Sequence, residues 1–182
     1  MDNLLNQLKQ NYQSIEESTS PAFCYMLGFS GSDLTRLKKL QNDLDLDGEK
    51  TKKDDFHITV RYVRTPRFDD YKFFVAYLEH QKELPAMYCK TVGFDILGKD
   101  KDCLVLKIES PDLTKYFEKV NKWLVDNGYP KSDYSTYKPH ITLSEKKDIT
   151  KPKWDSKYEM SLRLCTHIVS DTNRRKVFKK EL

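Results

Sequence analysis

Apolar side chains recur along this chain at two different spacings, which predict helices in some segments and strands in others. The N-terminal segment carries Leu4, Leu8, Tyr12 and Ile15 at intervals of three or four residues, so residues 1–20 are predicted to form an amphipathic helix and a polar linker. Comparable stripes predict three further helices: one capped by Ser32 and stopped at Gly48, one between Pro66 and Pro85, and one between Ser110 and Gly128.

Six intervening segments have the short, β-branched and aromatic character of strands. They are residues 22–29, 56–63, 87–97, 103–109, 139–143 and 159–169, and the third and fourth flank Gly98 as a hairpin. The order is strand, helix, strand, helix, two strands, helix and then two or more strands, which indicates an α+β domain rather than a doubly wound parallel sheet. We expect one folded domain over residues 21–182.

Composition narrows the classes of protein that fit this pattern. The chain has 182 residues, 38% of them hydrophobic, which is enough for one domain with its own core and too many for a disordered chain. No apolar run is long enough to cross a bilayer, and the first residues do not resemble a signal peptide, so we expect a cytoplasmic protein. The four widely spaced cysteines favour reduced thiols over a zinc site. A net charge of +4 suits an anionic ligand without requiring one.

A five-residue pattern that occurs twice is the most informative feature of the sequence. Phe56-His57-Ile58-Thr59-Val60 is matched by Pro139-His140-Ile141-Thr142-Leu143, with the two histidines 83 positions apart. Residues two apart on a strand share a face, so each histidine projects together with its threonine. A single histidine on a strand is usually a buried structural residue. Two copies in the same frame, among only four histidines, indicate a shared function.

Two histidines and two hydroxyls that face one another suit the cleavage of a phosphodiester. The reaction needs a base for the attacking hydroxyl or water and an acid for the leaving oxygen, and histidine serves in either role near neutral pH. The threonine hydroxyls would donate to the non-bridging phosphate oxygens. We therefore expect His57, Thr59, His140 and Thr142 to be catalytic, and we expect neither a metal nor a cofactor.

The paired motif resembles that of the two-histidine (2H) phosphoesterases, which carry one His-x-Thr/Ser motif in each of two pseudo-symmetric lobes. The resemblance covers residues 22 to about 169 and implies a bilobal α+β fold with two antiparallel sheets, flanking helices and a central cleft. It also implies metal-independent phosphodiesterase activity. The stretches Lys53-Asp54-Asp55-Phe56-His57 and Tyr137-Lys138-Pro139-His140-Ile141-Thr142-Leu143-Ser144 look most like the phage anti-CBASS phosphodiesterases. That narrower resemblance implies a cyclic or short oligonucleotide substrate and, for a viral protein, the host-cell cytoplasm. From the sequence itself we expect no membrane and no obligate protein partner.

Polar residues beside the motifs are candidates for contacts with the substrate. Arg61 and Ser144 lie two positions beyond the motif threonines, so on regular strands both would continue the rows that face the cleft. Arg61 could pair with phosphate oxygens, or it could be a solvated arginine. Lys138, just before the second motif, is a further candidate.

Three tyrosines could stack on a nucleobase, namely Tyr25, Tyr62 and Tyr137. Packing in the core is the alternative for each of them. It is the stronger alternative for Tyr62, because that residue alternates with Arg61 and would then point away from the cleft.

Two other patterns are weaker. Asp43, Asp45, Asp47 and Gly48 copy the opening of a calcium-binding loop, but Asp54 stands where that loop needs glutamate, so we interpret the segment as a solvated loop. Basic clusters at residues 146–147, 151–153 and 174–180 could attract an anionic substrate or form an ordinary solvated surface.

Two other functions fit the sequence. One keeps the chemistry but takes RNA ends with 2′,3′-cyclic phosphates or 2′,5′-oligoadenylate as substrate. The other is a nucleotide- or RNA-binding module without catalysis, which would not need both histidines as acid and base.

Overall fold

The fold was analysed in a computed structural model, which describes residues 21–182 except 45, 47, 66–68, 82, 83, 99, 101 and 133–135. Its elements are β1 (Ala22–Phe29), α2 (Gly31–Asp43), β2 (Glu49–Lys50), the 3-10 turn η1 (Lys53–Asp55), β3 (His57–Arg64), α3 (Tyr71–His80), β4 (Met87–Leu97), β5 (Cys103–Glu109), α4 (Pro111–Asp126), β6 (His140–Glu145), the 3-10 turn η2 (Ser156–Tyr158), β7 (Ser161–Ser170) and β8 (Lys176–Glu181). None of the helices in this described part has the length and apolar character needed to cross a membrane.

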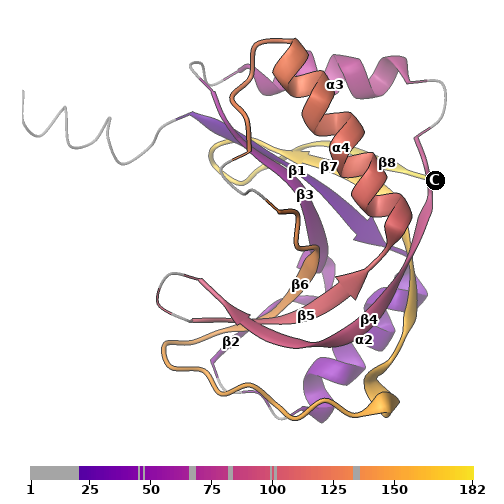
Figure 1. The fold of residues 1–182 in the computed structure, drawn as a ribbon, viewed down its shortest axis with the longest axis vertical. Coiled ribbons are helices and arrows are strands. Elements are labelled where there is room, and N and C mark those ends of the chain that lie inside the picture. The colour runs from indigo at the N-terminus through magenta and orange to yellow at the C-terminus, as the bar shows by residue number, and fades with distance from the viewer. Residues whose placement is uncertain are drawn as a thin grey trace, which may run out of the picture.

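One curved antiparallel sheet of eight strands runs through the molecule (Figure 1). The strand order is β2-β6-β5-β4-β7-β1-β3, and β8 pairs with β7. The α+β class and the antiparallel pairing agree with the expectation from sequence, but the two expected sheets are joined. Strand β7 causes the join, because its first residues pair with Met87–Lys90 of β4 and the rest of it pairs with β1 and β8.

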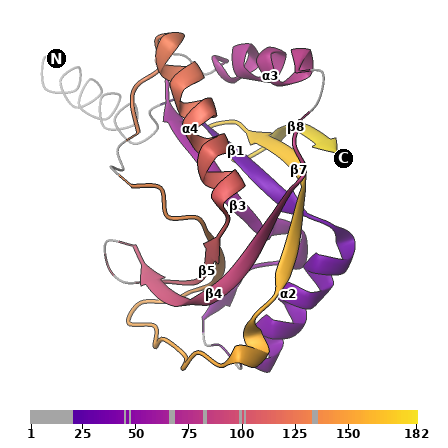
Figure 2. The ribbon, with the colours of Figure 1, turned by 45° about the vertical axis from the view of Figure 1, so that its right-hand side comes forward.

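Helices α2 and α4 each reach a strand of the other half of the sheet (Figure 2). Helix α2 follows β1, yet the side-chain amide of Gln41 donates to the carbonyl of Leu143 in β6 at 2.6 Å. Helix α4 follows β5, yet the hydroxyl of Tyr116 forms a 2.7 Å hydrogen bond with that of Tyr25 in β1. Each half therefore depends on a helix that the other half supplies.

Most predicted elements are present, and the differences have local causes. Ser30, not Ser32, caps α2, because its hydroxyl accepts from the backbone amide of Asp33 as the helix begins at Gly31. Strands β2 and β8 were not predicted, since one has two residues and the other has only two apolar residues among six. The helix predicted within residues 1–20 lies outside the described residues.

Candidate active site

Strands β3 and β6 carry the two motifs and have the same irregularity at the same place. In each, the histidine and the threonine are partly exposed while the isoleucine between them is buried. Just beyond each threonine the pairing with the neighbouring strand skips one residue, Val60 in β3 and Leu143 in β6. Such a β-bulge reverses the alternation of side chains that follow it.

Both histidines are held by the backbone in the same way. The Nδ1 atom of His57 lies 2.7 Å from the carbonyl oxygen of Asp55, and that of His140 lies 2.8 Å from the carbonyl oxygen of Lys138. A carbonyl only accepts, so Nδ1 carries the hydrogen in each ring. In the neutral imidazole the Nε2 atom is then left with its lone pair, ready to accept a proton.

The two imidazoles are close enough to influence one another. Burial is the main cause that lowers the pKa of His57 below its ordinary value of 6.5, and the charges of Lys176 and His140 lower it further. The carbonyl and the carboxylate of Asp55 oppose this shift. Because the pKa falls, the neutral form of His57 dominates at neutral pH.

Each motif threonine also contacts a cysteine on the neighbouring strand. The thiol of Cys24 in β1 donates to the hydroxyl oxygen of Thr59 at 4.0 Å, and Cys103 in β5 lies 3.7 Å from the hydroxyl of Thr142. Burial raises the pKa of Cys24 to about 11 and also raises that of Cys103, so both remain neutral thiols. This repeated contact was not foreseen from sequence, where the cysteines were interpreted as ordinary reduced thiols.

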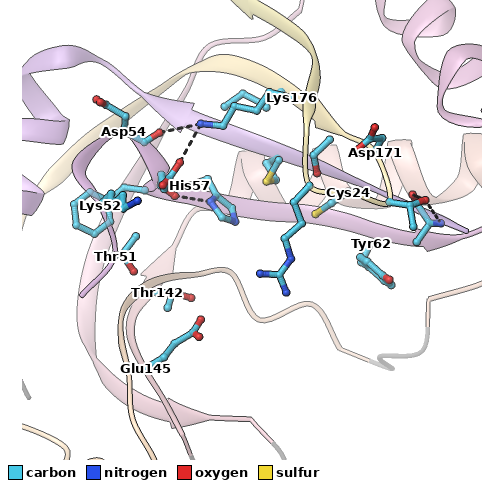
Figure 3. A pocket seen from close by; sticks show the side chains of 18 of the residues that line it. Cys24, Thr51, Lys52, Asp54, His57, Tyr62, Thr142, Glu145, Asp171 and Lys176 are labelled. Carbon is cyan, nitrogen blue, oxygen red and sulfur yellow. Dashed lines mark hydrogen bonds and ion pairs between the residues drawn. The ribbon is translucent and has the colours of Figure 1, made fainter. Parts of the chain in front are cut away.

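A cleft of about 1130 Å³ lies over this face of the sheet. One residue of each motif, His57 and Thr142, lines it, and both point into the same space together with Glu145 (Figure 3). Thr59 and His140 are partly exposed but are not among the lining residues. The rest of the lining combines apolar residues of β1 with charged, hydroxyl-bearing, aromatic and aliphatic residues from the elements around it: Ala22, Cys24, Met26, Glu49, Lys50, Thr51, Lys52, Asp54, Asp55, Phe56, Tyr62, Arg64, Ile168, Ser170, Asp171, Thr172, Arg174 and Lys176.

The β-bulges overturn two of the predicted substrate contacts. Arg61 is only 5% exposed, and its guanidinium donates to Asn121, to the Tyr62 carbonyl and to the carbonyl of Pro130. Ser144 is fully buried. Both would face the cleft on a regular strand, but each comes after the skipped residue and so points into the protein.

Tyr25 is also excluded as a contact for a nucleobase, because it is fully buried. It alternates with Cys24 and Met26, which line the cleft, and its hydroxyl bonds to Tyr116 and His167 instead. The bulge has the opposite effect on Tyr62, which is 50% exposed and lines the cleft.

Tyr137 and Lys138 lie beside the motifs without lining the cleft. The ring of Tyr137 stacks on Phe117 at 4.2 Å, and its hydroxyl donates to the carbonyl of Thr59 at 3.0 Å. It therefore ties the segment before β6 to strand β3. The side chain of Lys138 is exposed, and its carbonyl is the one that holds His140.

The charged lining residues Arg64 and Glu145 were not foreseen from sequence, and the β8 residue Lys176 was expected only as part of a basic cluster. Arg64 and Glu145 can be assigned to the cleft only when the positions of the bulges are known, and those positions follow from the pairing between strands. Of the predicted basic clusters, only Arg174 and Lys176 reach this cleft. Lys146 and Lys147 line a smaller hollow with Asp100 and Asp102.

Comparison with known families and structures extends the likeness beyond the motif. The sequence profile of the family described as anti-CBASS protein Acb1 matches residues 25–177. No curated protein matches the chain.

Solved structures share the fold at low sequence identity. The protein TT0787 of Thermus thermophilus has a TM-score of 0.67 and 13% identity, over 88% of this chain and 97% of its own. Escherichia coli LigT with 3′-AMP has a TM-score of 0.61 and 10% identity, over 89% and 94% of the two chains. Kluyveromyces marxianus Usb1 has a TM-score of 0.54 and 10% identity, over 91% and 99%.

Proposed function

The chain belongs to the Acb1 family of anti-CBASS proteins, and we propose that it is a phosphodiesterase that opens cyclic oligonucleotide messengers with two His-x-Thr motifs. The family and the fold shared with phosphoesterases support the phosphodiesterase class. LigT structures that contain 3′-AMP, ATP or NADP+ support a nucleotide as the ligand of this fold.

The observation that carries the proposal is the duplicated geometry around the histidines. In both halves a backbone carbonyl holds Nδ1, the threonine hydroxyl lies two residues further along the same strand, and the isoleucine between them is buried. Two proton-transfer groups of equal construction suit a reaction in which one proton is removed and another is supplied. A module that only binds nucleotides would not need this duplication.

The first step converts a 3′,5′ linkage into a 2′,3′-cyclic phosphate. The ribose 2′-oxygen forms a bond to the adjacent phosphorus while the bond from phosphorus to the 5′-oxygen breaks. The base accepts the proton of the 2′-hydroxyl at Nε2, and the second histidine donates its Nε2 proton to the leaving 5′-oxygen. Thr59 and Thr142 donate hydrogen bonds to the non-bridging oxygens as negative charge increases on them.

The second step opens the 2′,3′-cyclic phosphate with water and returns both histidines to their starting protonation states. The histidine that lost its proton now accepts one from water, whose oxygen bonds to phosphorus. The other histidine returns a proton to the departing 2′-oxygen, which leaves a linear 3′-phosphate. No step uses a metal, so an excess of chelator should leave turnover unchanged.

The cleft itself supports a substrate larger than a mononucleotide. Pockets for drug-sized ligands span about 300–1,000 Å³, and this cleft of about 1130 Å³ exceeds that range. Its lining places basic residues such as Arg64 and Lys52 among acidic ones such as Glu145. Basic groups suit phosphates and acidic groups suit the amino groups of bases, so the mixed lining fits a ligand that offers both.

A substrate panel tests the proposal. Cyclic dinucleotides, cyclic triadenylate, 2′,5′-oligoadenylate and RNA with a 2′,3′-cyclic phosphate end would each be incubated with the protein and analysed by mass spectrometry. We expect cleavage of a cyclic oligonucleotide, with a 2′,3′-cyclic phosphate as the first product. Cleavage confined to the linear substrates, or tight binding without any product, would overturn the proposal.

Matched variants connect that activity to the motifs. We expect His57→Ala and His140→Ala each to lower turnover by about 100-fold or more, while His80→Ala serves as the control. His80 is exposed at the end of α3, with its Nδ1 atom on the carbonyl of Ala76. Full activity in either motif variant would contradict the assignment.

A further inference from the structure

Strand β8 brings a lysine to one histidine of the pair. The Nζ atom of Lys176 lies 3.2 Å from the carbonyl oxygen of Asp54 and 3.2 Å from a carboxylate oxygen of Asp55 (Figure 3). The carbonyl of Asp55 in turn accepts from Nδ1 of His57 at 2.7 Å. Lys176 thus holds the two residues that precede the first motif, one of which holds the catalytic imidazole.

The second motif differs at this point, although the rest of its geometry is repeated. The residue two positions before His140, which supplies the carbonyl to its ring, is Lys138. A basic side chain therefore stands where the first motif has the acidic Asp55. The side chain two positions before the histidine is therefore negative in the first half and positive in the second, so the two histidines are placed in different electrostatic surroundings.

We infer that Lys176 is a positioning residue that fixes the Asp54–Asp55 turn beside His57 and favours His57 as the proton acceptor in the first step. This inference rests on the proposed function for the role in the reaction, but the contact of Lys176 with that turn does not. His140 then supplies the proton to the leaving oxygen. The sequence left this division of roles open, because the two motifs read alike.

The charges around His57 determine whether replacing Lys176 raises or lowers the pKa of His57. Asp55 on η1 favours the imidazolium form, whereas Lys176 on β8 and His140 on β6 oppose it. The lining also places Lys52, Asp54 and Glu145 around the same space. Replacing Lys176 by a neutral residue removes one opposing charge and leaves the Asp55 carboxylate without its partner, and both changes favour the protonated ring.

The decisive measurement is a proton NMR titration of the histidines, which needs no substrate. The chain has only four histidines, so the signal of His57 is assigned from its loss in His57→Gln. In Lys176→Met we expect the midpoint of His57 to rise by several tenths of a pH unit, and in Lys176→Arg we expect it to return toward the original value. Lys179→Met is the control, since Lys179 lies on the same strand and pairs with Glu181.

Kinetics with cyclic triadenylate separates positioning from substrate binding. A positioning role predicts that kcat falls in Lys176→Met, on the order of tenfold, with KM nearly unchanged and the acidic limb of the pH profile moved upward. An unchanged His57 midpoint in Lys176→Met, equal to that of Lys179→Met, would overturn the inference. So would a rise in KM alone. If no cyclic oligonucleotide of the panel is cleaved, the proposed function fails, while the NMR titration still tests the contact of Lys176 with the Asp54–Asp55 turn.

Discussion

At the scale of single residues, the two threonines share three features. Each follows its histidine by two positions, precedes the skipped residue of its strand and contacts a neutral cysteine thiol. A thiol that donates to the threonine oxygen leaves the hydroxyl hydrogen free for another acceptor. The donation from Cys24 leaves the Thr59 hydrogen free for a phosphate oxygen, and the Thr142 hydroxyl is equally free when Cys103 is the donor in that contact.

Removing either hydroxyl should therefore impair catalysis more than stability. We expect Thr59→Val and Thr142→Val each to lower kcat by about 100-fold, the usual effect of deleting one donor that stabilises developing charge. Valine keeps the shape of threonine, so the melting temperature should change little. The exposed residue Thr150 supplies the control variant Thr150→Val. A loss no larger than that of the control would contradict the role of the threonines.

The cysteine in the cleft should react slowly despite its position. The pKa of Cys24 is raised to about 11, so the nucleophilic thiolate is scarce at pH 7.5. We expect alkylation of Cys24 by iodoacetamide to be at least about tenfold slower in the folded protein than in urea. Mass spectrometry of the peptides measures both rates. Rapid labelling of the native protein would show that burial does not protect this thiol.

At the scale of elements, the β-bulge in β3 gives neighbouring arginines different tasks. Arg61 points inward and joins β3 to Asn121 of α4 and to the carbonyl of Pro130 beyond that helix. Arg64, three residues further along, is exposed and lines the cleft. The first arginine therefore belongs to the packing of elements and the second to the surface that a ligand can reach.

Stability measurements can separate these tasks. We expect Arg61→Met to lower the free energy of unfolding by about 2–4 kcal/mol, because the buried guanidinium and its hydrogen bonds to Asn121, to the Tyr62 carbonyl and to the Pro130 carbonyl are lost. Arg64→Met should change it by no more than about 0.5 kcal/mol, as surface substitutions usually do. Urea denaturation gives both values. An equal loss of unfolding free energy in Arg61→Met and Arg64→Met would contradict the assignment of Arg61 to the packing and Arg64 to the surface.

At the scale of the whole molecule, a buried polar chain joins the halves. The hydroxyl of Tyr116 bonds to that of Tyr25, which bonds to Nδ1 of His167 on β7, and Nε2 of His167 donates to the carbonyl of Pro85 at 3.2 Å. His167 is fully buried, so burial is the main cause that lowers its pKa from 6.5 to about 4. The folded protein therefore keeps this imidazole neutral where the unfolded chain would protonate it.

Folding stability should consequently depend on pH in the acidic range. The unfolded chain binds a proton at His167 below about pH 6.5 and the folded protein only near pH 4, so stability is lost as the pH falls between these values. The loss from His167 should reach about 3 kcal/mol at pH 4. His57 adds to it in the same direction.

The variant His167→Gln isolates this contribution. Glutamine has no proton to gain, so the difference in unfolding free energy between pH 7 and pH 4 should shrink by about 3 kcal/mol relative to the original protein. Urea denaturation at both pH values measures it. An equal pH dependence in both proteins would contradict the assignment to His167.

Local signals in the sequence were enough for most of the elements and for the motif residues. The helix stripes, the hairpin around Gly98 and the two His-x-Thr patterns are all written in neighbouring positions, where periodicity and side-chain chemistry act directly. The same alternation misplaced Arg61 and Ser144, because a period of two holds only while the strand is regular. Valine and leucine are ordinary strand residues, so nothing at positions 60 and 143 of the sequence indicates that the pairing skips them.

The sequence by itself determined the α+β class, the paired motifs and the kind of chemistry, since these depend on short-range pattern and residue type. Only the tertiary structure decided which side chains face the cleft, which polar residues are buried and which of the two motif histidines lies beside Lys176. These depend on pairing between distant strands: Tyr25 with Arg61 across the bulge of β3, and Lys176 of β8 brought to Asp55. Such contacts join residues far apart along the chain, and periodicity within one segment carries no information about them.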